Sequence, residues 1–169
     1  MECQVDILIE DPRWGDLALE KLAPGACAAA IRTVGLDPQD CEVSILACND
    51  ERISQLNTEF RDKPQPTNVL SWPTVDLAPE VPGQTPGLPG KSDENGRVEL
   101  GDIAIAYETC VREAAEMNRE IDFHVAHLVI HATLHLLGYD HIREQDAVKM
   151  ESLERESLAC LGFPDPYAI

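Results

Sequence analysis

Residues 131–141 read His131-Ala-Thr-Leu-His135-Leu-Leu-Gly138-Tyr-Asp-His141. His131 and His135 are four positions apart, so on a helix both imidazoles lie on one face, one turn apart. Gly138 can adopt the left-handed conformation that ends a helix, and the chain can then bring His141 back toward the first two histidines. We therefore predict that these three histidines hold one metal ion per chain, on and just after a central helix.

A three-histidine site leaves the fourth tetrahedral position open for water or substrate, which is typical of catalytic zinc. We predict Zn²⁺, although three imidazoles also suit Ni²⁺ and Cu²⁺. Asp140 or a backbone carbonyl could accept the second ring proton of a ligand, while a turn-forming role explains Asp140 equally well. We interpret His124 and His127, on the same helix face, as packing residues.

The segments around this motif predict an α+β fold in which a small mixed sheet of about four strands is packed with helices. Expected strands, from alternating or continuous apolar runs, are 5–9, 42–47, 68–72 and 98–106. Expected helices are 14–34 with a break at Pro24-Gly25, one that Asn49 or Asp50 caps, 108–137 and 144–161.

We expect the 169 residues to form a single domain. Residues 73–97 hold five of the twelve prolines and four glycines without an apolar period, which predicts a flexible surface loop. The sequence shows neither a signal peptide nor a membrane span, and its six cysteines form no CxxC pair. A cytoplasmic protein without membrane contact is therefore expected.

The net charge of −18 argues against general nucleic-acid binding, because phosphate binding depends on Lys and Arg. The stretch 52–75 is an exception, with Arg52, Arg61 and Lys63 against two acidic residues. A polyanion would have to bind there, beside the positive charge of the metal ion.

The spacing HxxxHxxGxxH is also that of metzincin proteases, whose motif carries a glutamate after the first histidine as general base. Ala132 stands at that position here. Peptide hydrolysis would lack the group that deprotonates the attacking water, so a protease is disfavoured although its ligand spacing is present.

Three segments together resemble the YbeY endoribonucleases, metalloproteins associated with ribosomal RNA maturation and ribosome quality control. These are the stretches 56–73, 100–105 and 127–141, in the order and spacing of that family. Ala132, Trp72 and Phe60 replace the commoner Gly, Phe and Tyr, and the loop after residue 73 is longer than in compact members. None of these departures affects a predicted ligand.

The resemblance implies a zinc-dependent, single-strand-specific endoribonuclease that matures ribosomal RNA at the 16S 3′ end. It implies the metal site given above and a catalytic role for Arg61, whose guanidinium can hold a phosphate in a bidentate manner. Read from position alone, an arginine at a helix end such as Arg61 is more often a solvated charge or a partner of the helix dipole.

Lys63, Asn68 and Ser71 are further candidate RNA contacts; Asn68 and Ser71 could instead cap turns or bond the backbone. Expected partners are single-stranded or ribosomal RNA and the ribosome or its proteins, with no DNA. Two alternatives remain open: a metalloprotease-like hydrolase, and a non-enzymatic ribosome assembly factor with a bound metal.

Overall fold

The computed structural model describes residues 3–90 and 96–168. At its centre is a four-stranded sheet with the order β1-β2-β4-β3. The strands are β1 (Gln4–Ile9), β2 (Cys41–Cys48), β3 (Val69–Pro73) and β4 (Val98–Ala106). The pairs β1–β2 and β2–β4 are parallel, whereas β3 pairs with β4 in the antiparallel sense. The predicted α+β fold with a small mixed sheet is confirmed.

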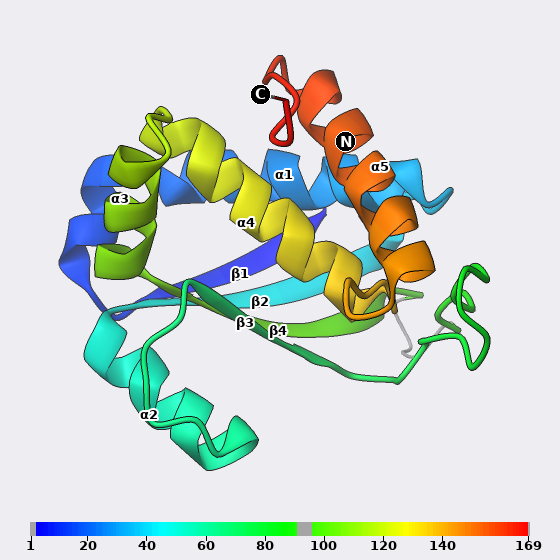
Figure 1. The fold of residues 1–169 in the computed structure, drawn as a ribbon, viewed down its shortest axis with the longest axis horizontal. Helices are drawn as coiled ribbons and strands as arrows, with labels where there is room; N and C mark the ends of the chain where they lie inside the picture. The colour runs from blue at the N-terminus through cyan, green and yellow to red at the C-terminus, as the bar shows by residue number, and fades with distance from the viewer. Residues whose placement is uncertain (1–2, 91–95, 169) are drawn as a thin grey trace.

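Most of the helices lie on one face of the sheet. In the described parts of the chain the helices are α1 (Leu19–Thr33), α2 (Asp50–Arg61), α3 (Tyr107–Glu116), α4 (Ile121–Leu136) and α5 (Glu144–Cys160). Figure 1 shows α1, α3, α4 and α5 above the sheet, with α4 crossing it diagonally. The core lies between this helical layer and the inner faces of β2 and β4, where Ile45, Ile105 and Ile130 are buried. None of the described helices is long and apolar enough to cross a membrane.

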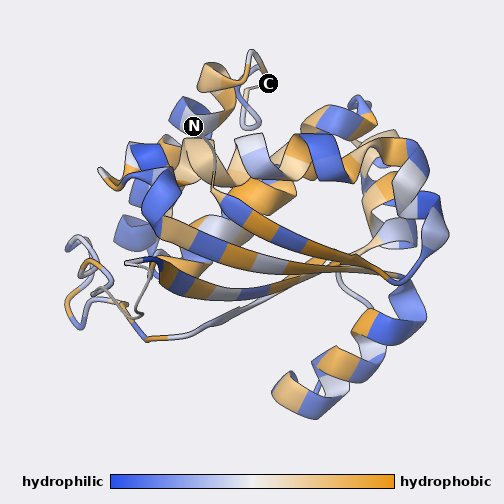
Figure 2. Cartoon of the chain, turned by 180° about the vertical axis from the view of Figure 1, so that it is seen from behind, coloured by the Kyte–Doolittle hydropathy of each residue, from blue (hydrophilic) through white to orange (hydrophobic). Residues whose placement is uncertain are grey.

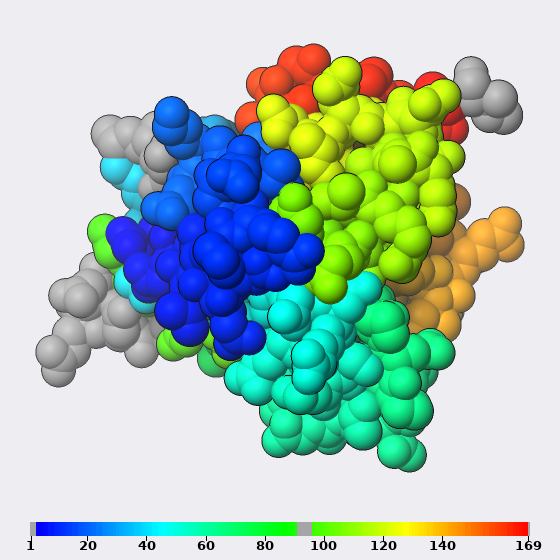
Figure 3. All heavy atoms as spheres, turned by 90° about the vertical axis from the view of Figure 1, so that its left-hand side faces the viewer, coloured from blue at the N-terminus to red at the C-terminus, as the bar shows by residue number. Residues whose placement is uncertain are grey.

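The second face of the sheet is only partly covered, because α2 is the one described helix on that side (Figure 1). In the space-filling view of Figure 3, α2 and the residues after it, in cyan to green, form a projection below α3. Figure 2 shows that apolar and polar residues alternate along the strands of the sheet. A hollow of about 850 Å³ lies there, and Leu8 and Phe60 on its walls are 66% and 58% exposed. No histidine lines this hollow among the described residues.

The first helical region differs from its prediction, because no break occurs at Pro24. A 3₁₀ helix (Pro12–Leu17) comes first, and Ala18 in the left-handed conformation (φ 53°) separates it from α1. Pro24 lies inside α1 and removes one intrahelical hydrogen bond. The helix continues because Ala23, Ala26 and Cys27 are fully buried around that position, and tertiary packing outweighs the lost bond.

The single helix predicted over 108–137 is wrong, because two helices occupy this segment. α3 ends at Glu116 and α4 begins at Ile121, and Asn118 between them has a φ of 57°. The amide of Arg119 donates to the carbonyl of Ala114 at 2.8 Å and closes the turn. Asparagine tolerates the left-handed region better than most residues, so a turn forms here without glycine or proline.

The loop expected over 73–97 contains neither helix nor strand in its described residues after Pro73; residues 91–95 lie outside the described residues. Its contacts with α5 were not predicted. The amide of Gly83 donates to Asp146 Oδ1 at 2.9 Å, and the Arg143 guanidinium donates to the carbonyls of Pro79 and Glu80. The first part of the loop is thereby fixed to the beginning of α5.

We expect Gly101→Ala to destabilise the protein by about 3 kcal/mol or more, because Gly101 lies at a bulge in β4 with a φ of 145°. An added Cβ would lie 2.2 Å from the carbonyl oxygen of Trp72 in the paired strand. Urea unfolding measures the change. Gly15→Ala is the matched control, because no atom lies within 4 Å of its added Cβ; equal midpoints for the two variants would contradict the prediction.

Candidate metal centre and its cleft

The three histidines are positioned by the end of α4 and the turn that follows. α4 is apolar along most of its length and is buried against the sheet, which leaves His131 and His135 partly exposed on one side. Gly138 ends the helix with a φ of 98°, and its amide donates to the carbonyl of His135. An added Cβ at Gly138 would lie 2.8 Å from the backbone of Leu77 in the loop after β3. The left-handed turn predicted at this glycine is therefore present.

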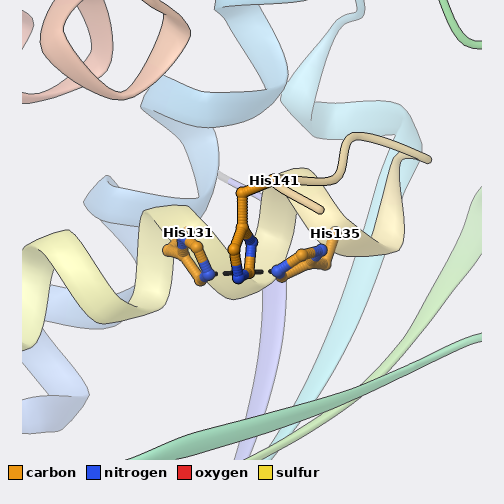
Figure 4. A group of neighbouring side chains, drawn as sticks. All are labelled: His131, His135 and His141. Carbon is orange, nitrogen blue, oxygen red and sulfur yellow. Dashed lines mark hydrogen bonds between the residues drawn. The ribbon is translucent and has the colours of Figure 1, made fainter. Parts of the chain in front are cut away.

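The three imidazoles converge on one point (Figure 4). His131 Nε2 and His135 Nε2 are 3.0 Å apart, and one ligand atom from each of the three rings lies within 4.8 Å of the others. Bonds of about 2.05 Å to a tetrahedral zinc ion would separate two nitrogens by roughly 3.3 Å. The side chain of His141 extends from the turn after α4, and its ring lies between the other two rings. The predicted triad could therefore hold a metal ion with little rearrangement.

The remaining ring nitrogens of the two helical histidines have hydrogen-bond acceptors. His131 Nδ1 lies 3.0 Å from Glu154 Oε2, and His135 Nδ1 lies 2.9 Å from the carbonyl oxygen of Tyr139. Because both acceptors carry no proton, both Nδ1 atoms donate, and the two Nε2 lone pairs face each other. Two lone pairs at 3.0 Å repel unless a cation lies between them, so the donor set fits a metal ion.

Burial keeps His135 ready for metal binding at neutral pH. Burial, and then the positive charges that His131 and His141 can carry, lowers the pKa of His135 to about 4. His135 is therefore neutral at pH 7, as a ligand must be. Of the two roles left open for Asp140, the turn-forming contact is present: its Oδ1 accepts the backbone N–H of His141 at 2.7 Å. Its distance to His141 Nδ1 is 3.9 Å.

Glu154 on α5 is a buried residue of the site that the sequence did not reveal. It is 1% exposed and accepts from His127 Nε2 at 3.0 Å as well as from His131 and the Tyr167 hydroxyl. Burial alone would raise the pKa of Glu154, but the hydrogen bonds from His127 and His131 outweigh it and lower the pKa to about 2. The charged carboxylate therefore fixes the ring of His131. His127, interpreted as a packing residue, belongs to this network.

We expect Glu154→Gln to weaken zinc affinity by about 10-fold to 100-fold, the usual effect of removing a partner of a ligating histidine. The amide has one acceptor oxygen for the three donors that the carboxylate serves. Competition with a chromophoric chelator measures the affinity. Glu156→Gln is the control, because Glu156 is exposed on the same helix; equal affinities for the two variants would refute a positioning role for Glu154.

The remaining predicted site residues lie in the same cleft as the histidines. This cleft has a volume of about 340 Å³, and its lining includes Arg61, Lys63, Asn68 and Ser71 together with His131, His135 and His141. It lies between the end of α2, β3 and the end of α4. Segments that are about 70 residues apart in the sequence thus meet at one hollow.

Arg61 and Lys63 are held at the cleft by the way α2 ends. Asp62 has a left-handed φ of 55°, and the amide of Lys63 donates to the carbonyl of Asn57 at 3.2 Å. The side chain of Asn57, 3% exposed, donates to the carbonyl of Gln65 at 2.9 Å. Asn57 is a second residue that sequence reasoning missed; it fixes the loop that carries Lys63.

Asn68 and Ser71 line the cleft from β3 and the residue before it. The Asn68 amide donates to Glu113 at 3.0 Å, and its side-chain oxygen accepts the N–H of Val69 at 2.7 Å. The backbone-bonding alternative for Asn68 is therefore present in the structure. Ser71 is partly buried opposite Ile103 in the sheet.

The fold and the site together define an α+β protein with a three-histidine centre that could hold a metal ion at a polar cleft. Residues 9–162 match the family model described as endoribonuclease YbeY. The chain belongs to this family.

Relatives cover nearly the whole chain. A Ruegeria pomeroyi protein named endoribonuclease YbeY is 54% identical over 165 residues, 98% of each chain. A Jannaschia protein of the same name is 52% identical and covers 97% of this chain and 99% of its own. A solution structure of a Thermotoga maritima protein matches 98% of this chain and 100% of its own with a TM-score of 0.54 at 22% identity, which supports the fold.

Proposed function

We propose that this chain is a zinc-dependent endoribonuclease that cuts single-stranded RNA at the cleft between α2, β3 and α4. Membership of the endoribonuclease YbeY family makes RNA the substrate. The observation that carries the metal-dependent mechanism is the convergence of three imidazoles with Arg61 and Lys63 in one cleft. In a chain with a net charge of −18, this is a place where phosphate would meet positive charge.

Each residue of the cleft has a distinct task in this reaction. When bound by the three histidines, a zinc ion supplies a Lewis acid with an open coordination position. Arg61 binds the scissile phosphate and stabilises the negative charge that develops on its oxygens. Lys63 neutralises a neighbouring phosphate, and Ser71 of β3 and Asn68 just before it contact the nucleotide. His131, His135 and His141 act as ligands and do not transfer protons.

The fully buried Ala132 argues against peptide hydrolysis as the activity of this site. A metalloprotease with this spacing needs a carboxylate at that position to take a proton from the attacking water. At Ala132 the wall of the cleft offers a methyl group instead. The ligand spacing is thus compatible with a protease, but the general base is missing at that position.

The biological setting that we propose is the maturation of ribosomal RNA, at the 16S 3′ end, and ribosome quality control in the cytoplasm. The chain acts as a single domain in this proposal, with the ribosome or its proteins as partners. Single-stranded RNA suits the cleft because unpaired bases can leave the strand and be bound by side chains, whereas bases in a duplex are stacked inside it.

Metal analysis of the purified protein, followed by nuclease assays, tests this function. The zinc-loaded protein should cut a single-stranded ribosomal RNA fragment, leave the same sequence uncut as a duplex, and leave casein intact. Adding a chelator should stop the reaction and zinc should restore it. A zinc-loaded, nuclease-free preparation that cuts no RNA would refute the proposal, and casein cleavage would favour the protease.

A further inference from the structure

A second cleft adjoins the first one on the side of α3 and the C-terminal segment. It has a volume of about 360 Å³, and Asn68 and His131 line both clefts. An RNA strand whose phosphate lies at the three histidines would therefore have a neighbouring nucleotide next to this hollow. Nothing in the reaction described above uses it.

The walls of the second cleft combine apolar surface with two charged groups. Met117, Leu128 and Tyr167 provide the apolar part, and Met117 and Tyr167 are 53% and 39% exposed. The charged groups are Glu113 and Arg119. Unpaired bases bind on such apolar and aromatic walls because both faces of a base are apolar, while its edge needs hydrogen-bond partners.

Glu113 is held in place as a hydrogen-bond acceptor. Its Oε1 accepts from Asn68 Nδ2 and from the buried His124 Nε2, each at 3.0 Å. Its Oε2 has a single longer contact with Asn68, at 3.3 Å, among the hydrogen bonds of the described residues. A carboxylate oxygen has room for two hydrogen bonds, and the side chain is 25% exposed. Glu113 can therefore accept a hydrogen bond from a molecule in the cleft.

Arg119 offsets the negative charge of Glu113 at the same cleft. Its guanidinium lies 3.1 Å from His127 Nδ1 and donates to the carbonyl of Pro166, and it stacks on Phe123 at 4.8 Å. These contacts hold a cation at the cleft, so the polyanionic backbone of a nucleic acid can approach despite the glutamate.

From this arrangement we infer that the second cleft is a nucleobase subsite that selects a base with an exocyclic amino group, adenine, cytosine or guanine, over uracil. The inference rests on the proposed RNA substrate. An amino group donates to Glu113 Oε2, whereas uracil presents carbonyl oxygens on both sides of its single N–H, and these are repelled by a carboxylate. Selectivity of this kind acts one nucleotide away from the bond that is cut.

Binding of oligonucleotides without a free 2′-hydroxyl to the zinc-loaded full chain tests the subsite. The probes are 2′-O-methyl uridine hexamers with one adenosine, cytidine or guanosine at each position in turn, followed by fluorescence anisotropy at fixed salt. For one position, all three replacements should bind about tenfold more tightly than the all-uridine probe. Glu113→Gln should remove this preference, because its Oε1 still serves Asn68 and His124 while an NH₂ group replaces the second acceptor.

Two further variants separate a loss of base selectivity from a general loss of RNA binding. Glu116→Gln, an exposed residue of the same helix, should keep the preference of the wild type. Met117→Ala should weaken the binding of all probes by a similar factor, since it removes only apolar contact. A wild type without a preferred position, or a preference that survives Glu113→Gln, would overturn the subsite. Failure of the nuclease proposal is seen separately, as a zinc-loaded protein that cuts no RNA.

Discussion

We expect His141→Ala to lose its zinc and to cut single-stranded RNA at least about 1,000-fold more slowly than the wild type. Two histidines remain on α4 after this change, and two neutral ligands do not complete a catalytic zinc site. His141 is the best of the three ligands to replace, because its side chain is 53% exposed and its loss opens no core cavity. The side chains of His131 and His135 are more buried than that of His141.

The measurement is zinc content by elemental analysis together with the single-turnover rate on one RNA substrate. Ile142→Ala is the matched control, because Ile142 is the next residue of the same turn and is 83% exposed. Its zinc content and rate should equal those of the wild type. If His141→Ala kept one zinc per chain and a normal rate, the three-histidine centre would not be the site of the chemistry.

Strands were easier to predict from the sequence than helix ends. The strand expected at 98–106 coincides with β4, and the others agree to within one or two residues, because alternation records which side chains face the core. No comparable pattern in the sequence marks the division between α3 and α4. Met117 and Ile121 continue the helical spacing of apolar residues across it, and the sequence pattern does not show that Asn118 takes the left-handed conformation.

Local geometry explains why the histidine cluster was predictable. A spacing of four on a helix and a glycine at its end are short-range features, and they bring the three rings together whatever the rest of the fold does. The acceptors of their second protons depend on distant segments instead. Glu154 is 23 positions from His131 and reaches it only because α5 packs against α4.

A signal for Glu154 was nevertheless present in the sequence. Met150 and Leu158 lie four positions to either side of it, and both are fully buried, so the glutamate occupies a core position of α5. A charge at such a position requires partners. Asn57 carried no such signal, because Ile53 four positions before it is buried but Arg61 four positions after it is exposed, and the carbonyl of Gln65 that it binds belongs to the loop after the helix.

Arg61→Ala should lower the cleavage rate by about 100-fold to 1,000-fold, the usual effect of removing one donor that stabilises transition-state charge. Arg61 is exposed at the end of α2 and has no carboxylate partner among the salt bridges of the described residues, so its loss should leave the fold intact. The cleavage rate of Arg61→Lys should lie between those of Arg61→Ala and the wild type, because an ammonium keeps the charge but cannot bind a phosphate in the bidentate manner.

The salt dependence of RNA binding separates a phosphate contact from an indirect effect. Each phosphate contact on single-stranded nucleic acid contributes about 0.7 to the slope of log affinity against log salt concentration, so Arg61→Ala should reduce that slope by about 0.7. Arg52→Ala is the matched control: it removes the same charge from the same helix, at the hollow on the opposite face of the sheet. Its slope and rate should match those of the wild type. An Arg61→Ala variant with an unchanged slope would mean that Arg61 does not touch phosphate, and equal losses in both variants would mean that α2 contributes only its overall charge.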